Sequence, residues 1–427
     1  MNTNSGSLRR IFLGAVGLGS LVANSYACSS SDPPAPAAND AGLMPDTNLT
    51  PDANLTPDAN LPPDARTPIV TVPGTTGNGG FQKVAQTNLF ADMKNGGAAN
   101  VDPNLVNSWG LAFNPTGIAW VSDNGKGLLT LYQPNKSTPL PLVVQVPLPG
   151  FVYPSDGGMA AAPTGMVFNA SAAVPGAGQT NDFLGDLFIV ATEDGTIAGW
   201  QPSFGDQTKA ALRDDMSGGK ARFKGLAIVP SSPQILIAAD FHNDVIVPFA
   251  TDYNLAPHAD GKWVDPSVPA GFAPFNVFAT PTNVFVAYAK QDAQQKNDVA
   301  GAGNGAISVF DLTGTLVKTL IPQSATNLLN SPWGMNIVPM GGWGSLPAGT
   351  LVVGNFGDGT IHAFDANTGK PIAAFANSSG APLVIDGLWA LVWGPNAPEA
   401  GASPKQLFFT AGPNHEMNGL FGFLTAQ

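Results

Sequence analysis

The sequence predicts an all-β fold, a six-bladed β-propeller, and three observations support that prediction. One imperfect pattern occurs six times: a Gly-Leu or Gly-Met pair opens an apolar strand, and a turn leads to a second apolar strand that ends at an acidic or glycine-rich corner. The strands are short, rich in β-branched and aromatic residues and bounded by turn residues, which is typical of antiparallel hairpins. No long helical period competes with them. A repeat of about 40 to 60 residues with four strands indicates one propeller blade, because a lone four-stranded sheet cannot cover both of its faces.

The copies follow one another to the C-terminus. In chain order they open at Gly110, Gly165, Gly225, Asn276, Gly334 and Gly387, with Phe275-Asn276-Val277 in place of the glycine pair in the fourth copy. A polar insertion, 290–304, separates two strands of that fourth copy. The segment 82–91 precedes the first copy, so we expect it to be an outer strand that pairs with the last blade and closes the ring. A solenoid or a sandwich is the alternative architecture.

The first copy resembles NHL-type propellers. Their repeat joins a Pro-x-Gly turn to a strand ending in Val-x-Asp and then to a short strand with an aromatic residue, which IAWVSD (118–123) and LTLY (129–132) match. The stretch DPNLVNSWGL (102–111), followed by the corner Asp123-Asn124-Gly125, is similar to an uncharacterised family of secreted bacterial propellers. This resemblance covers the chain from Phe81 to the C-terminus. It implies a fold, and it implies no particular activity.

Residues 1–27 have the pattern of a signal peptide. Arg9 and Arg10 precede an apolar run, 11–23, of about 13 residues, which suits a signal-peptide core and is too short to span a membrane. Phe12 and Leu13 follow the arginine pair at the offsets of a twin-arginine export signal, while the other flanking residues leave the Sec route open. We therefore expect export to the periplasm, the outer membrane or the cell surface.

Cys28 is the only cysteine in the chain, so an intrachain disulfide is excluded. One interpretation is ordinary cleavage after Ala27 that leaves Cys28 as a free thiol. The other is a lipoprotein signal in which Cys28 becomes diacylated, although Ser25 departs from the large aliphatic residue usual at that position. The small, flexible segment 29–36 favours lipidation, because lipoproteins carry such a tether behind the anchor. We expect contact with a membrane only through this anchor.

The segment 28–80 is predicted to be a disordered tether. It contains a hexapeptide repeat, PDTNLT, PDANLT and PDANLP, from Pro45 onward. Proline at every sixth position sustains neither a helix nor a central strand, so we expect a solvated, extended spacer. The predicted organisation is therefore a signal peptide (1–27), a tether (28–80) and a propeller (81–427).

The composition agrees with an exported β protein. Only 11% of the residues are charged, against about 25% in typical soluble domains, while 50 glycines and 39 prolines supply turns. The formal net charge of -12 disfavours nucleic acid and anionic lipid headgroups as partners.

Motifs of common enzymes are missing from the sequence. It contains neither a Gly-x-Ser-x-Gly elbow nor a phosphate-binding Gly-x-x-x-x-Gly-Lys-Ser/Thr loop. The histidines lie in separate copies without metal-ligand spacing, so structural or surface roles are expected for His242, His258, His362 and His415. Four aspartates recur at strand-end corners, where a carboxylate accepts backbone N–H groups of a turn: Asp123, Asp194, Asp240 and Asp358.

The candidate ligand site lies at the mouth of the central channel. In a propeller the innermost strand of each blade starts there, so the residues around each opening glycine converge. Across the copies these residues are Asn107, Trp109, Thr164, Lys224, Asn276, Asn330, Trp333 and Asp386. The structural alternative is that the tryptophans pack between blades and the asparagines cap loops.

Two functions of different class remain open. The first is a binding module on the cell envelope that takes a protein, a glycan or a small molecule. The second is a metal-dependent hydrolase or lactonase similar to the gluconolactonase-like propellers, in which an ion at the channel mouth polarises an ester carbonyl. Its ligands would be Asn107, Asn276, Asn330 and Asp386, an oxygen set that suits Ca²⁺. The Lys224 cation in the same ring speaks against this second function.

Overall fold

The computed structural model describes residues 80–154, 159–172, 182–257 and 261–427. These residues all belong to one compact unit. The predicted signal peptide, Cys28 and all of the predicted tether except its last residue lie outside the described residues, as does His258. Within the described ranges, no helix has the length and apolar character needed to cross a membrane.

Strands dominate the described part of the chain. Two precede the repeat: β1 (Gly80–Ala91) and β2 (Asn100–Val101). Four sheets of consecutive strands follow: β3 (Ser108–Phe113), β4 (Ala119–Asp123), β5 (Leu128–Tyr132) and β6 (Val144–Gln145); β7 (Pro163–Phe168), β8 (Phe188–Thr192), β9 (Thr196–Trp200) and β10 (Ala211–Asp215); β11 (Phe223–Val229), β12 (Ile235–Asp240) and β13 (Val245–Phe249); β14 (Phe272–Ala279), β15 (Val284–Lys290), β16 (Gly305–Phe310) and β17 (Leu316–Ile321).

The remaining strands share one sheet with β1 in the order β18-β19-β20-β21-β1-β24-β23-β22, and β2 pairs with β1. They are β18 (Pro332–Ile337), β19 (Thr350–Asn355), β20 (Ile361–Asp365), β21 (Pro371–Ala376), β22 (Leu388–Trp393), β23 (Gln406–Ala411) and β24 (Leu420–Ala426). Short 3-10 helices lie in the connections: η1 (Asn124–Lys126), η2 (Pro149–Phe151), η3 (Asp182–Gly185), η4 (Ser217–Gly219) and η5 (Pro398–Ala400).

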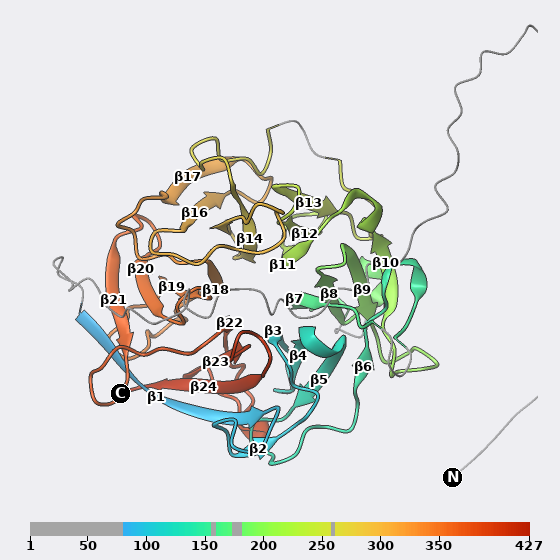
Figure 1. Cartoon of the computed structure of the whole chain (residues 1–427), viewed down its shortest axis with the longest axis horizontal. Helices are drawn as coiled ribbons and strands as arrows, with labels where there is room; N and C mark the ends of the chain where they lie inside the picture. Colours follow the sequence, from blue (N-terminus) through green and yellow to red (C-terminus); the bar gives the residue numbers. More distant parts are fainter. Residues whose placement is uncertain (1–79, 155–158, 173–181, 258–260) are drawn as a thin grey trace, which may run out of the picture. The chain divides into compact units, whose positions relative to one another are not determined.

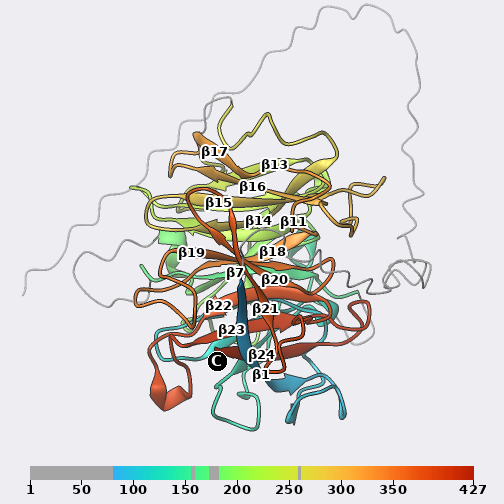
Figure 2. The same cartoon turned by 90° about the vertical axis from the view of Figure 1, so that its left-hand side faces the viewer.

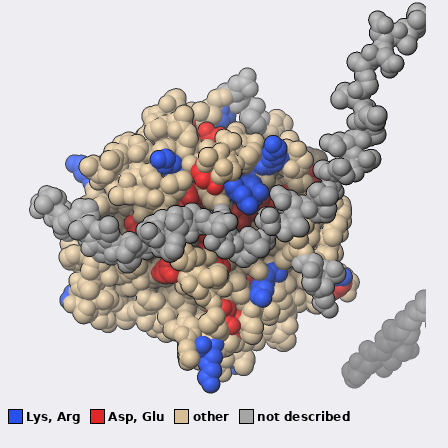
Figure 3. All heavy atoms as spheres, in the orientation of Figure 1, with Lys and Arg blue, Asp and Glu red and all other residues tan. Residues whose placement is uncertain are grey.

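The strands are arranged around a centre. The innermost strands contact one another in the order β3, β7, β11, β14, β18 and β22, and β22 contacts β3 again. Figure 1 shows the chain running once around this centre, with these strands innermost. The predicted all-β propeller fold is confirmed. Apolar residues between neighbouring sheets form the core, and the face seen in Figure 3 is largely uncharged with scattered Lys, Arg, Asp and Glu.

The strand β1 closes the ring as predicted. It pairs antiparallel with β24, from Val84 opposite Ala426 to Ala91 opposite Leu420, and Figure 2 shows the two strands side by side. Its first residues also pair in parallel with β21, which the sequence did not predict. One strand near the N-terminus of the described chain therefore ties together the last two groups of strands.

The structure explains why glycine opens most copies. A shift of register occurs at this place in the pairing of every innermost strand with the next strand, and such bulges bring backbones close together. A Cβ atom on Gly110 would lie 2.3 Å from the carbonyl oxygen of Thr164. One on Gly165 would lie 2.5 Å from the amide nitrogen of Leu226. Glycine is required because the innermost strands of neighbouring groups touch through their backbones.

We expect the Gly165→Ala substitution to destabilise the protein by about 1–3 kcal/mol, because the new methyl group must displace backbone atoms. Chemical denaturation measures this loss. Gly205→Ala is the matched control, since a Cβ atom there meets nothing within 4 Å. Equal stabilities of the two variants would contradict the proposed close packing.

The sequence-based register of the sixth copy is wrong by three residues. In β22 the register shift lies between Leu388 and Leu391, so Ala390 takes the place of the opening glycine. Gly387 lies before this strand with φ 64°. Consequently Trp389, and not Asp386, is the counterpart of Trp109 and Trp333.

Three of the four strand-end aspartates accept backbone N–H groups, as predicted. The donors are Ala162 to Asp194, Arg222 to Asp240 and Thr360 to Asp358. The fourth, Asp123, differs because its hydrogen-bond partner is the side chain of Thr130.

Asp123 belongs to a buried chain of hydroxyl and carboxyl groups. Its Oδ2 lies 2.6 Å from the Thr130 hydroxyl, which lies 2.9 Å from the Tyr132 hydroxyl, which in turn lies 2.9 Å from Oδ2 of Asp102. Burial raises the pKa of Asp123 well above its usual value, against the Thr130 hydrogen bond, and the charge of Asp102 raises it further. Each hydroxyl has one hydrogen to donate, so Thr130 cannot donate to both Asp123 and Tyr132. When Asp123 is protonated, it donates to Thr130, Thr130 donates to Tyr132, and Tyr132 donates to the Asp102 carboxylate.

We expect Asp123→Asn to make the protein more stable at neutral pH. Because the folded-state pKa is raised, the stability that Asp123 contributes is complete below its unfolded value of about 3.9 and is lost as pH rises through the folded value. Asparagine imitates the protonated group and does not titrate. The melting temperature of Asp123→Asn, taken relative to that of the wild type, should rise with increasing pH. A variant that is less stable than the wild type at every pH would contradict a protonated Asp123.

Candidate functional site

The site is built on the first residue inside the register shift of each innermost strand, directly before the opening position. These six residues, here called the inner ring, are Trp109, Thr164, Lys224, Phe275, Trp333 and Trp389. All of them are buried. They lie toward the N-terminal ends of the innermost strands, so they surround one end of the central channel.

The tryptophans of the inner ring close the channel at this level. The Trp109 and Trp389 rings are stacked with centroids 3.5 Å apart, and Phe356 stacks on Trp389 at 3.8 Å. Trp333 meets both indoles edge-on, at 6.1 and 5.8 Å. Such contacts stabilise aromatic pairs beyond the burial of their area. Together Trp109, Trp333, Trp389 and Phe356 form an apolar layer below the channel mouth, here called the tryptophan floor.

Lys224 is the cation of the inner ring. Its Nζ lies 5.1 Å from the centroid of Trp109 and 5.8 Å from that of Phe241, within the range of cation–π attraction. It also forms an ion pair with Glu193, whose side chain keeps only 18% exposure while that of Lys224 keeps 4%. Burial by itself would raise the pKa of Glu193, but the Lys224 charge and hydrogen bond outweigh it and lower the pKa.

Two asparagines extend this pair into a network. Asn124 Nδ2 donates to Glu193 Oε2 at 3.0 Å, and Asn107 Nδ2 donates to Asn124 Oδ1 at 3.1 Å and to Glu416 Oε2 at 2.9 Å. The indole N–H of Trp389 donates to Asn107 Oδ1 at 3.1 Å, which fixes the amide orientation. We call these residues the mouth cluster: Asn107, Asn124, Glu193, Lys224 and Glu416.

Glu416 is held by an unusual turn. Asn414, His415 and Glu416 all have left-handed backbone conformations, with φ of 57°, 56° and 65°. For L-residues this conformation costs roughly 1–2 kcal/mol per residue, and such strain concentrates at functional sites. Burial raises the pKa of Glu416 to about 7, with a further rise from the charge of Glu193 and an opposing effect of Lys224. A carboxyl group with this pKa in a channel mouth marks a candidate functional site.

The structure brings part of the predicted site together. Asn107, Trp109, Lys224 and Trp333 meet at the channel mouth: the Lys224 ammonium lies over Trp109, and the indole N–H of Trp333 donates to the Lys224 carbonyl. Thr164 is also in the inner ring, but its hydroxyl donates a hydrogen bond to the carbonyl oxygen of Phe223 at 2.7 Å and so links two strands.

The other three predicted residues are not members of the mouth cluster. Asn276 replaces the opening glycine and donates from Nδ2 to the Trp333 carbonyl at 2.7 Å. Asn330 donates to Asp358 Oδ2 at 3.0 Å, and exposed Asp386 accepts from the amide of Asn414 at 2.8 Å.

Within the described ranges, no group of three or more His, Cys, Asp or Glu side chains is arranged to hold a metal ion. The predicted calcium ligands, Asn107, Asn276, Asn330 and Asp386, each use protein groups as hydrogen-bond partners. Calcium binding by this set stays a prediction.

Sequence reasoning missed Trp389, Asn124, Glu193 and Glu416. Aligning the sixth copy on its tryptophan rather than on Gly387 would have found Trp389. Asn124 and Glu193 each adjoin a strand-end aspartate, Asp123 and Asp194, so the corner motif carried a signal. Glu416 had none, because its position depends on the left-handed turn.

Comparisons with known proteins identify relatives of this chain. No family model matches it. R648, an uncharacterized protein of Acanthamoeba polyphaga mimivirus, is 30% identical over 340 residues, which cover 78% of this chain and 78% of R648. The chain belongs to the R648 family. A further relative of this R648-family chain, uncharacterized protein L690 of the same virus, is 28% identical over 344 residues, 79% of this chain and 85% of L690.

Solved structures with similarity to this R648-family protein include a streptogramin B lyase, with 10% identity and a TM-score of 0.43 over 77% of this chain and 96% of the lyase. Another is the calcium-binding protein regucalcin of Agrobacterium tumefaciens, with 12% identity and a TM-score of 0.45 over 81% of this chain and 96% of regucalcin.

Proposed function

We propose that this R648-family protein is a six-bladed, NHL-like propeller that binds a small ligand at its mouth cluster. The observation that carries the proposal is Glu416: a carboxyl group with a pKa of about 7 that accepts a hydrogen bond from Asn107 and is the last of three consecutive left-handed residues. A purely structural turn has no need of such strain. Six innermost strands in cyclic contact support the blade number.

The chemistry of the cluster indicates the class of ligand. Asn107 and Lys224 are buried, whereas Asn124, Glu193 and Glu416 are half-buried, so oxygen-bearing groups form the accessible part. Two carboxyl groups stand against one ammonium group. We therefore propose a small molecule that donates hydrogen bonds, such as an amine or an amino sugar.

The N-terminal sequence supports a location for this binding module. We propose that residues 1–27 direct export, that Cys28 is lipidated and that residues 28–80 tether the propeller to a membrane of a bacterial cell envelope. The support is the arginine pair ahead of a short apolar run and the proline-rich hexapeptide repeat. Mass spectrometry of the purified mature protein tests this: a diacylated N-terminal Cys28 is expected, and an unmodified cysteine would contradict the anchor.

Thermal melting of the full chain with sugars, amino sugars and small amines tests ligand binding, because a ligand that binds only the folded state raises the melting temperature. We expect a rise with amines or amino sugars that Glu416→Gln abolishes. Glu399→Gln is the matched control, since Glu399 is exposed and far from this turn in sequence. A rise that survives Glu416→Gln would contradict the proposal. A rise with Ca²⁺ alone, lost in Asn330→Ala and Asp386→Ala, would favour the hydrolase instead.

The pH dependence gives a second readout. Glu416 is ionised above a pH of about 7, in the field of Glu193, Lys224 and Asp298, so affinity for a cationic amine should increase as pH rises through this value. Titration calorimetry on both sides of this pH measures the change, and Glu416→Gln should remove it. A pH-independent affinity in the wild type would exclude Glu416 as the ligand's partner.

A further inference from the structure

The central channel contains a cavity beyond the tryptophan floor. Its volume is about 310 Å³, within the range of small-molecule sites. The walls come from the bulge-containing stretches of all six innermost strands, including 110–112, 165–168, 226–228, 276–279, 333–336 and 390–392. Except for Trp333, which belongs to the inner ring, these residues lie after the inner ring along each strand, so the cavity extends from the stacked indoles away from the mouth cluster.

The lining of the cavity is least buried at the end remote from the mouth cluster. Trp333 and Trp389 at the floor are buried. Phe168, Phe278 and Val392, near the C-terminal ends of their strands, are half-buried. Exposure of the lining side chains therefore increases along the channel away from the tryptophans.

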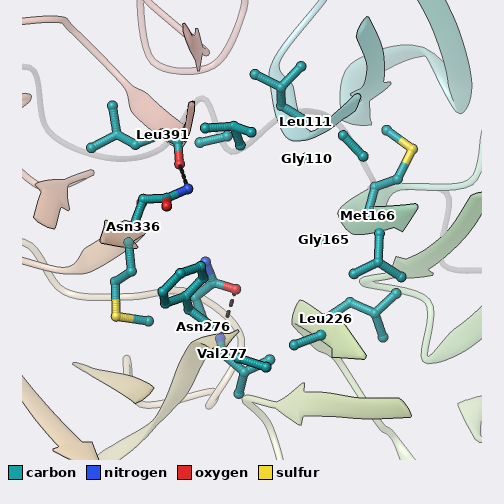
Figure 4. A pocket seen from close by; sticks show the side chains of 18 of the residues that line it. Gly110, Leu111, Gly165, Met166, Leu226, Asn276, Val277, Asn336 and Leu391 are labelled. Atoms are coloured by element: carbon teal, nitrogen blue, oxygen red, sulfur yellow. Dashed lines mark hydrogen bonds between the residues drawn. The ribbon is translucent and has the colours of Figure 1, made fainter. Parts of the chain in front are cut away.

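The lining is apolar on one side and carries two carboxamides on the other. Figure 4 shows Asn276 and Asn336 on the same side of the cavity, across from Leu111, Met166 and Leu226. Among the lining residues of the described chain none is charged. Methionine side chains adapt to ligands of different shape, and Met166 and Met335 both belong to the wall.

Both carboxamides retain hydrogen-bonding capacity. Asn276 accepts from the amide of Val277 at 2.8 Å and donates to the Trp333 carbonyl. Asn336 repeats this arrangement, accepting from Ile337 at 2.9 Å and donating to the Leu391 carbonyl at 3.2 Å. An asparagine side chain has two N–H donors and two acceptor sites. Each of these two asparagines therefore keeps one N–H donor and one acceptor site for a ligand, while its protein hydrogen bonds fix the orientation of the carboxamide.

We propose that this cavity is a second binding site, for a neutral, mainly apolar small molecule with one hydrogen-bonding edge. The apolar wall and the absence of charge among the lining residues disfavour ions, because a buried charge without a partner is costly. The two oriented carboxamides select a carbonyl, hydroxyl or N–H group on one edge of the ligand. The site is independent of the mouth cluster, because the tryptophan floor lies between them.

Fluorescence titration of the full chain with N-phenylnaphthylamine tests this site. The probe is neutral and apolar and has one N–H group. We expect saturable binding of one molecule per chain, and no comparable binding of its sulfonated analogue, anilinonaphthalene sulfonate, whose charge finds no partner in the lining. Absence of saturable binding, or equal binding of both probes, would overturn the proposal.

A cavity-filling variant locates the bound probe. Val277→Phe adds volume to the wall and should weaken binding at least about tenfold. Val317→Phe, on the outer strand β17 where valine is 54% exposed, is the matched control and should bind as the wild type does. Circular dichroism verifies folding; if Val277→Phe does not fold, Leu111→Phe on the opposite wall replaces it. Unchanged affinity in a folded wall variant would place the probe elsewhere and sink the proposal.

Discussion

Replacing Trp389 with alanine is expected to lower the free energy of unfolding by about 3–5 kcal/mol. Trp389 is 1% exposed and its ring stacks on both Trp109 and Phe356. Its indole N–H also orients Asn107, so the substitution removes the centre of the tryptophan floor and a support of the mouth cluster together. Equilibrium denaturation measures the loss.

Phe151→Ala serves as the comparison for this large aromatic deletion, because Phe151 is 69% exposed and exposed substitutions usually change stability by less than about 0.5 kcal/mol. A loss of less than about 1 kcal/mol in Trp389→Ala would mean that the channel floor collapses into the gap without cost, against the close packing described here.

Replacing Lys224 with methionine is expected to cost about 3–5 kcal/mol, because it leaves the largely buried Glu193 carboxylate without its cation. The further substitution Glu193→Gln should recover much of the loss, since neither member of the pair then carries a charge. Unfolding free energies of the two single variants and the double variant form a cycle that isolates the coupling of the pair.

The pH dependence of this cost has a defined sign. Lys224 lowers the pKa of Glu193, so the stability from the pair is present above the unfolded value of about 4.3 and is lost as pH falls through the folded value. The difference between wild type and Lys224→Met should therefore shrink in acid. Exposed Lys126→Met is the control and should leave stability nearly unchanged; a similar loss in both variants would contradict the role of burial.

The candidate site was only partly visible in the sequence, for reasons specific to each residue. Asn107, Trp109 and Lys224 were predicted because the repeat places residues near each opening glycine at the channel. Asp386 was chosen from an alignment on Gly387, whereas the bulge in β22 puts Ala390 at the shared position. A glycine with positive φ before a strand and a glycine at a bulge have different physical causes, and a sequence pattern alone does not separate them.

The sequence by itself determined the all-β class and the closure of the ring by β1, because hairpin chemistry and the spacing of repeats are local properties. Only the tertiary structure decided the mouth cluster and the cavity. Asn107 and Glu416 are 309 positions apart, and the carboxyl group reaches the amide through ring closure and a left-handed turn. The raised pKa of Glu416 likewise depends on burial and on charges from distant parts of the chain, which are properties of packing that no short stretch of sequence carries.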